Sequence, residues 1–428
     1  MAIRPVPAVL LFVSATSLLP AQIRDTAYVI RDVRVFDGES IAERQTVVIS
    51  QGRITAVGGS QAAGPAGAQE IDGKERTLLP GLMDAHVHLP VFPVSTAEAL
   101  QQSLAFGVTT SIVMWAAPTE FASRLKELQT SDALDVSAIV TAGTGATAPG
   151  GHPTQMNPPG APSLFPTLTT PGEADAFVAA RVAEGSDFIK IIYDDIERYG
   201  HKLPTLDEAT VAALATAAHA HGRIAVAHIG TERDARGAIT AGVDGLAHLF
   251  DGTTVSADFG PFAAAHGVFV IPTLSVLYAA CGMPDGPGFL TEPDTMKQVK
   301  PQFRPLLEMP VAPSNLRCDA APQAVRQLAA ARVPLLAGTD VPAPGTTYGA
   351  SLHKELEHLV SAGLTPTAAL AAATSATAKA FRMTDRGRIG VGMRADLMLV
   401  DGDPSKQIRA TRNIVAIWRR GVRVQRAP

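Results

Sequence analysis

The sequence is poor in aromatic residues, and its body contains no long apolar run. Aromatic residues make up only 5% of the 428 residues, whereas apolar residues make up 46%. The apolar content is therefore mostly Ala, Val, Leu and Ile, a mixture that is typical of α/β proteins, in which helices pack closely against strands. Beyond residue 20, no segment has the roughly eighteen uninterrupted apolar residues that a membrane-spanning helix needs. We therefore expect a mature protein without a membrane segment.

The sequence also lacks a charge excess and several familiar motifs. Its formal net charge is −4 and it has no basic run, which argues against nucleic acid as a partner because phosphate binding needs clustered Lys and Arg. No G-x-G-x-x-G follows the first strand of the central region, and the Gly-rich segment 141–151 does not end in Gly-Lys-Ser/Thr. No G-x-S-x-G is present either. These absences disfavour a dinucleotide-binding fold, a P-loop and a serine hydrolase.

Cysteine is nearly absent. Cys281 and Cys318 both fall in a Pro-rich connection, residues 274–319. In an oxidising compartment they could form a disulfide, whereas in a reducing one they would remain thiols. The sequence does not show their separation in space, so both alternatives stay open, and neither cysteine has a metal-ligand spacing.

The first residues have the pattern that is typical of an export signal. Arg4 precedes an apolar run at residues 8–19, and Pro20-Ala21-Gln22 offers a small residue at a plausible cleavage point. The run is too short for a good membrane span. We predict a signal peptide at residues 1–21 and a protein exported to the periplasm or beyond the cell.

The two ends of the remaining chain resemble each other in pattern. Residues 27–35, 46–50 and 53–57 alternate as strands do, and three further short strands are expected near the C-terminus, at residues 396–400, 414–418 and 422–424. The ends flank a middle of different character. We therefore predict one small β-sandwich domain built from residues 22–79 and 387–428.

The middle of the chain, residues 80–386, alternates short apolar runs with Ala-rich segments of helical spacing. Repeated strand-then-helix units imply a parallel sheet, and eight such units can close into a TIM (β/α)8 barrel. A doubly wound open sheet is the alternative. The eight expected strands are residues 82–88, 109–114, 136–141, 188–192, 224–228, 245–249, 268–273 and 333–338. Two connections, 142–170 and 274–319, are long enough to be expected as lids or substrate walls.

Histidines occur at the ends of several of these strands. His86 and His88 close the first, and residues i and i+2 of a strand point to the same side. His228 and His248 each close a later run. An isolated H-x-H is a weak signal, but four imidazoles at strand ends predict a metal site, and imidazole suits zinc and similar metals. Asp340 ends the last expected strand. Its side chain could be a further metal ligand, or it could form an Asx-turn or a helix cap.

Lys190 lies inside an apolar run, where a lysine is costly to bury without a partner. Burial can lower its pKa, and the neutral amine could then take up carbon dioxide to form a carbamate, an anionic ligand that can bridge two cations. The alternatives are a lysine that extends to the rim or one paired with Asp194 or Asp195.

Taken together, these residues resemble the metal-ligand set of the amidohydrolase superfamily. The matching residues, in chain order, are His86, His88, Lys190, His228, His248 and Asp340. The segment 79–84 (LPGLMD) resembles that superfamily's approach to its first strand, and residues 387–392 (GRIGVG) with 395–397 (ADL) resemble its tail. Residues 188–193 and 352–356 are similar to the branch that includes imidazolonepropionase and the prolidase-like Xaa-Pro dipeptidases.

The resemblance implies a role for each residue. His86, His88 and Asp340 would hold one divalent metal, His228 and His248 a second, and carbamylated Lys190 would bridge them, with zinc the expected metal. Asp340 would also act in catalysis by moving a proton from the attacking water to the leaving amine. His152, in the long loop that follows the third strand, would steady the oxyanion or bind substrate, and Tyr193 would bind substrate. His201, His219, His221 and His266 are expected at the surface or at helix ends.

The expected activity is hydrolysis of an amide bond in a small peptide or an N-acyl amino acid, with a prolidase-like dipeptidase as the preferred hypothesis. Cyclic-amide or lactone opening is the nearest alternative, with phosphotriester hydrolysis as a side activity. The alternative from another class is an inactive metal-bound scaffold. Neither the sequence nor the resemblance specifies the oligomeric state, and a homo-oligomer is compatible with both.

Overall fold

The computed structural model describes residues 26–427, apart from residues 60–61, 90–94, 116–124, 126, 130, 132, 157–164 and 312–314. The predicted signal peptide at residues 1–21 lies outside the described residues. Within the described part, no helix has the length and apolar character needed to cross a membrane.

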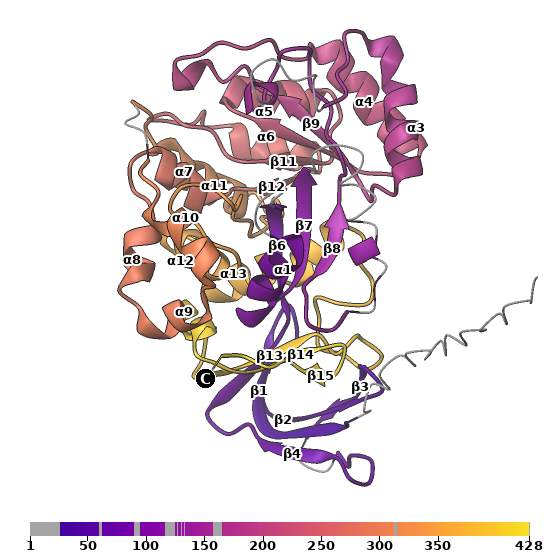
Figure 1. The fold of residues 1–428 in the computed structure, drawn as a ribbon, viewed down its shortest axis with the longest axis vertical. Helices are drawn as coiled ribbons and strands as arrows, with labels where there is room; N and C mark the ends of the chain where they lie inside the picture. Colours follow the sequence, from indigo (N-terminus) through magenta and orange to yellow (C-terminus); the bar gives the residue numbers. More distant parts are fainter. Residues whose placement is uncertain are drawn as a thin grey trace, which may run out of the picture.

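Both chain ends build one sheet at one end of the molecule (Figure 1). Its strands are β1 (Tyr28–Phe36), β2 (Ile41–Ser50), β3 (Arg53–Gly58), β4 (Gln69–Asp72), β5 (Arg76–Pro80), β13 (Leu397–Asp401), β14 (Ile414–Arg419) and β15 (Val422–Arg423). Their order is β15-β14-β13-β5-β1-β2-β3, and β4 pairs with β1. The predicted joint domain therefore has a structural basis in the antiparallel pairing of β5 with β13. Hydrogen bonding defines a single sheet, so the two-layer sandwich stays a prediction.

This sheet has a hydrophobic core of its own. Trp418 and Tyr28 are buried there and meet edge to face, with ring centroids 5.7 Å apart. Ile30, Val33 and Leu399 belong to the same buried cluster. On β14, Ala416 and Trp418 are alternate residues on this face, whereas on β1 the alternation of Tyr28 with Ile30 is interrupted before Val33 by a register shift.

The middle of the chain holds two parallel sheets. One contains β6 (Leu82–His88), β7 (Val108–Trp115) and β8 (Ala138–Thr141), and the other contains β9 (Ile189–Tyr193), β10 (Ala225–Ile229), β11 (Gly245–Ala247) and β12 (Phe269–Ile271). Each strand pairs in parallel with the next along the chain. Seven of the eight expected strands are thus present, with ends no more than two residues from the expected ones.

Backbone hydrogen bonds link these two sheets at both of their edges. Asp187 N donates to Thr141 O at 2.7 Å, next to the start of β9, and Leu336 N donates to Val270 O at 2.9 Å on β12. Ala85 N of β6 donates in turn to Ala337 O at 2.8 Å. The eighth expected strand, 333–338, is therefore an extended connector rather than a regular strand. Sequential neighbours without a reversal of strand order give a TIM-barrel-like α/β fold and not a doubly wound sheet.

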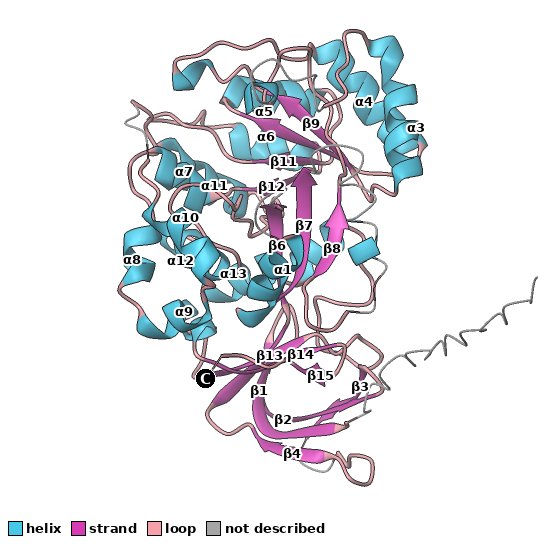
Figure 2. Ribbon diagram, in the orientation of Figure 1, coloured by secondary structure: helices cyan, strands magenta, loops and turns pink. Residues whose placement is uncertain are grey.

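Helices lie around the parallel strands (Figure 2). Thr231 illustrates how they begin: its hydroxyl accepts a hydrogen bond from Asp234 N, and the Asp234 side chain returns to the Thr231 backbone. The α-helices are α1 (Thr96–Ala105), α3 (Ala174–Glu184), α4 (Glu208–Ala220), α5 (Glu232–Thr240), α6 (Phe259–Ala265), α7 (Leu274–Ala280), α8 (Gly286–Leu290), α9 (Pro293–Gln298), α10 (Arg304–Glu308), α11 (Ala320–Ala330), α12 (Ala350–Ser361), α13 (Pro366–Ala372) and α14 (Ser375–Ala380).

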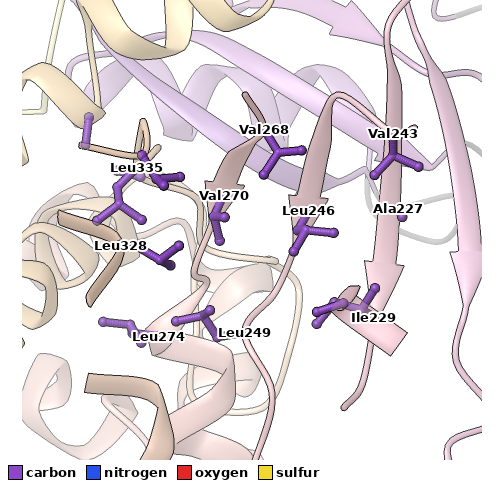
Figure 3. Packing of buried hydrophobic residues seen from close by; sticks show 14 of the residues in the cluster. Ala227, Ile229, Val243, Leu246, Leu249, Val268, Val270, Leu274, Leu328 and Leu335 are labelled. Atoms are coloured by element: carbon purple, nitrogen blue, oxygen red, sulfur yellow. The ribbon is translucent and has the colours of Figure 1, made fainter. Parts of the chain in front are cut away.

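The layer between strands and helices is apolar. Figure 3 shows Leu246 and Val270 on neighbouring strands β11 and β12, with Leu328 of α11 close by. Alternate residues of the strands face the other way. Val226 and Ala247, for example, pack in a separate buried cluster with Phe188 and Leu336. This alternation directs every second side chain of each parallel strand away from the helices and toward the inner face, where the candidate site lies.

The connection 274–319 is helical, which the sequence analysis missed. It holds α7 to α10, and Cys281 and Cys318 form a disulfide whose Cα atoms are 6.2 Å apart. Lys300 Nζ donates to Gln101 Oε1 of α1 at 2.6 Å, so part of the connection packs along the outside of that helix. Its expected role as a lid or substrate wall stays a prediction.

We expect the disulfide to contribute substantially to stability. Replacing both cysteines, Cys281→Ser with Cys318→Ser, removes a link across 37 residues of sequence, which corresponds to about 4 kcal/mol of unfolding free energy in the chain-entropy account. Guanidinium unfolding of the oxidised wild type, the reduced wild type and the double variant measures this difference. Coincident transitions for all three would contradict the expectation.

Candidate metal centre

Three side chains from the first and last barrel segments converge. Asp340 Oδ1 lies 3.1 Å from His86 Nε2 and 2.9 Å from His88 Nε2, and the two imidazole nitrogens are 3.2 Å apart. Ligand atoms of a tetrahedral zinc ion, each at 2.0–2.1 Å from the metal, are about 3.3 Å from one another. The three atoms are therefore spaced as ligands of one ion are.

Backbone pairing sets this arrangement. Asp340 N donates to His86 O at 2.8 Å, and His88 N donates to Val341 O at 2.7 Å. Gly338 is required at the crossing, because a Cβ there would lie 2.9 Å from His86 Cβ. Asp340 itself has a φ of 59°, in the left-handed region that few residues other than glycine adopt. Such conformations cost energy and are concentrated at functional sites.

His248 joins the same group through a similar backbone turn. Its φ is 77°, directly after β11 ends at Ala247, whose side chain already faces the interior. Strict alternation would turn His248 outward, and the left-handed turn redirects it. Ligand atoms of His86, His248 and Asp340 all lie within 4.8 Å of one another. The Nδ1 atom of His248 contacts Thr273 Oγ1 at 2.7 Å.

His228 lies beside this group on β10. Its ring centroid is 4.5 Å from that of His248 and 5.2 Å from that of His152. Its Nε2 donates to Asp194 Oδ2 at 2.9 Å. All four strand-end histidines and Asp340 are thus brought together.

Lys190 is buried without a hydrogen-bond partner among the described residues. Burial lowers its pKa to about 7, although the charge of Asp340 acts in the opposite direction. Both alternatives from the sequence are excluded: Lys190 does not reach the rim, and the side chains of Asp194 and Asp195 contact Arg198 and Lys202 instead. Gly145 leaves room for it, since a Cβ there would lie 3.3 Å from Lys190 Cγ.

The electrostatics of the group suit a cation. Burial lowers the pKa of His86 to about 3 and that of His248 well below its usual value. Burial alone would raise the pKa of Asp340, but the neighbouring His86 and His248 bring it well below its usual range. Neutral imidazoles and an ionised carboxylate are the forms in which these side chains bind metal. The residues present therefore fit a divalent metal.

Sequence analysis missed two buried aspartates next to the ligands. Asp84 accepts hydrogen bonds from Thr339 N at 3.0 Å, Thr339 Oγ1 at 2.7 Å and His86 N at 3.2 Å. Asp194 contacts His228 and Arg198. Asp84 belongs to the LPGLMD segment noted above, and that was its only signal. The sequence indicates Asp194 only as a possible partner for Lys190.

His152 lies where a residue for the oxyanion or the substrate is expected. Burial lowers its pKa to about 3, and the nearby His228 acts in the same direction. Its Nδ1 contacts Gln155 Nε2 at 2.7 Å, which fixes the ring while it lies against His228. Its role in catalysis or substrate binding stays a prediction.

Tyr193 requires a correction. Its hydroxyl contacts Glu208 Oε1 of α4 at 3.5 Å, and a Cβ on Gly237 of α5 would lie 3.1 Å from its ring. It packs against the outer hydrophobic cluster and not against the metal ligands. The reason is strand parity: Tyr193 is three residues beyond Lys190 on β9, so the two side chains lie on opposite faces.

The other histidines make local contacts away from the ligand group. His219 contacts Asp244 at 2.8 Å and His221 contacts Asp175 at 3.0 Å, both near the end of α4. His353 is buried and bonds Phe106 O and Thr411 Oγ1, while His358 contacts Asp285. We assign none of these to the site.

A comparison with known families agrees with this geometry. The sequence profile of the amidohydrolase family matches residues 77–425. The chain belongs to the amidohydrolase family. It is accordingly a metal-dependent hydrolase of the class that acts on amide bonds, with small-molecule substrates, and the family generally binds divalent metals at sites of this kind.

Curated relatives are similar to this chain in sequence, and solved structures are similar to it in fold. Uncharacterised proteins of Mycobacterium tuberculosis and Mycobacterium bovis are 27% identical over 331 residues, 76% of this chain and 80% of each relative. A Xaa-Pro dipeptidase crystallised with methionine in its active site has a TM-score of 0.75 and 24% identity, covering 94% of this chain and 100% of its own. A molinate hydrolase has a TM-score of 0.71 and 20% identity, covering 94% and 95%.

The position of Tyr193 gives a prediction for this amidohydrolase. Tyr193→Phe removes a hydroxyl that contacts only Glu208 among the described residues, so we expect kcat and KM to change less than about twofold, since a substitution away from the site costs little. Steady-state kinetics on any hydrolysed substrate test this. A rise in KM of tenfold or more would restore Tyr193 as a substrate-binding residue.

Proposed function

We propose that this amidohydrolase cleaves the amide bond of small peptides or N-acyl amino acids, as a prolidase-like dipeptidase. The observation that carries the proposal is the convergence of His86, His88 and Asp340 beside a buried lysine that has no hydrogen-bond partner among the described residues. Such a donor set matches hydrolytic metal chemistry, and an inactive binding scaffold gives no reason to keep Lys190 buried at a cost.

The proposal includes two metal ions, with zinc as the expected metal. His86, His88 and Asp340 would hold the first, and His228 with His248 the second. Lys190 would bridge them after its neutral amine takes up carbon dioxide as a carbamate. Support for this comes from its burial, its lack of a described partner and its lowered pKa.

In the proposed mechanism, bound metal ions would supply Lewis-acid polarisation of the scissile carbonyl and would lower the pKa of the attacking water. Asp340 accepts the proton of that water on a carboxylate oxygen and delivers it to the leaving amine. The ring of His152 lies beside His228 and would donate a hydrogen bond to the oxygen that becomes negative as the carbonyl is attacked.

Two similar structures support the choice of substrate class. One is the Xaa-Pro dipeptidase described above, and another is a prolidase complexed with N-methylphosphonate-L-proline, with a TM-score of 0.72, 20% identity and coverage of 94% of this chain and 100% of its own. Opening of a cyclic amide or a lactone would use the same residues and is the second candidate. We also propose export through the N-terminal segment, which the disulfide supports because oxidising compartments preserve such bonds.

We expect turnover of Xaa-Pro dipeptides and N-acyl amino acids, with weaker turnover of lactones. Removing metal with a chelator should abolish activity, and adding zinc should restore it. A panel assay with the purified full chain measures both effects. Activity that persists after metal removal, verified by elemental analysis, would refute the metal-dependent mechanism.

Replacement of Lys190 tests the bridge. Lys190→Ala should bind fewer than two metal ions per chain and lose at least about a hundredfold in kcat/KM, because a ligand shared by both ions is removed. Short carboxylic acids such as formate should restore part of the activity by replacing the carbamate oxygens. Two metal ions retained in the variant would remove the bridge from the proposal.

A further inference from the structure

We propose that Asp194 and Arg198 are positioning residues that hold His228 in the orientation needed for the second metal ion. This inference rests on the two-metal site proposed above. It concerns residues outside the ligand set, which the strand-end pattern did not identify.

Asp194 fixes one nitrogen of His228. The side chain of Asp194 is fully buried, and its Oδ2 accepts the hydrogen bond from His228 Nε2 at 2.9 Å. A carboxylate oxygen can only accept, so the proton of the imidazole lies on Nε2. The lone pair of Nδ1 is thereby left free for a cation. A carboxylate that accepts from the second nitrogen of a ligating histidine sets both its tautomer and its ring orientation.

Arg198 in turn fixes Asp194. Its Nη1 lies 2.6 Å from Asp194 Oδ1 and 2.7 Å from Oδ2. Ile196 N donates to the same Oδ1 at 2.9 Å. The guanidinium lies over the ring of Tyr199, 4.7 Å from its centroid, and the Arg198 side chain is only 16% exposed. Such a partly buried pair is far less screened than a surface ion pair.

The surrounding backbone is shaped for this pair. Gly230 follows β10, and a Cβ at that position would lie 1.8 Å from Arg198 Nη1 and 2.4 Å from Asp194 Oδ1. Any other residue at position 230 would therefore displace the pair from its place beside His228. Ile196 adopts a φ of 48°, which costs energy in a β-branched residue and turns the chain so that its amide reaches Asp194.

A neighbouring ion pair on the same loop provides the matched control. Glu197 Oε2 accepts from Lys202 Nζ at 2.6 Å, and both side chains are more than half exposed. This pair contacts no metal ligand among the described residues. Glu197→Gln therefore removes a charge adjacent in sequence to Arg198 but leaves the contacts from Arg198 through Asp194 to His228 unchanged.

The experiment titrates metal-free protein with Zn²⁺ in competition with a chromophoric chelator, for wild type, Asp194→Asn, Arg198→Gln, Arg198→Lys and Glu197→Gln. We expect Asp194→Asn and Arg198→Gln to weaken one of two zinc sites by about 10- to 100-fold and to leave the other unchanged. Arg198→Lys should recover part of the loss because it restores the positive charge. Glu197→Gln should match wild type.

The outcomes separate this inference from the proposed function. One zinc site in the wild type would refute the two-metal centre itself. Two wild-type sites that stay equally tight in Asp194→Asn would refute the positioning role alone. Equal weakening of both sites would also refute it, since it would indicate a general disturbance. Thermal unfolding of the metal-free variants shows whether each is folded, and the Co²⁺ absorption spectrum reports the geometry of the affected site independently of activity.

Discussion

The site depends on one backbone contact between distant parts of the chain: the pairing of β6 with residues 337–341. Three hydrogen bonds join these segments, and they place Asp340 against His86 and His88. Asp84 strengthens the contact from within, because its buried carboxylate accepts from Thr339 and from the His86 amide. Gly338 permits the close approach. If this pairing were lost, the carboxylate would separate from the imidazoles, whatever happened to the remaining strands.

The site also contains several features that raise the free energy of the folded protein and that a bound cation would offset. The His86 imidazole and the Lys190 amine are buried, and the side chains of His228 and His248 are only 13% and 12% exposed. The backbone is left-handed at His248 and Asp340. Each feature costs free energy in the metal-free protein. The same groups become favourable when positive charge is placed between them, because ligand atoms of His86, His248 and Asp340 already lie within 4.8 Å of one another. A preorganised site of this kind needs little rearrangement to bind metal.

Much of this could be predicted from the sequence, for identifiable reasons. His86 and His88 were predictable because strand periodicity places residues i and i+2 on one face. The same rule, applied to β9, would have placed Tyr193 away from Lys190. His248 could not be oriented by periodicity, because a left-handed turn overrides it. Asp194 was not predictable as a partner of His228, since their contact spans 34 residues of sequence. The helices in 274–319 could not be predicted because they are short and most contain proline, so the sequence shows no clear helical pattern there.

The terminal sheet has a consequence for how the protein is made. β5 lies between β1, formed early in the chain, and β13, which begins at Leu397. β13 must therefore be synthesised before β5 can pair with it. Until then the unpaired amides and carbonyls along that edge of β5 can form hydrogen bonds with other chains. Synthesis of β13 is thus the step that covers β5, and a chain cut short before β13 would keep an open, aggregation-prone edge.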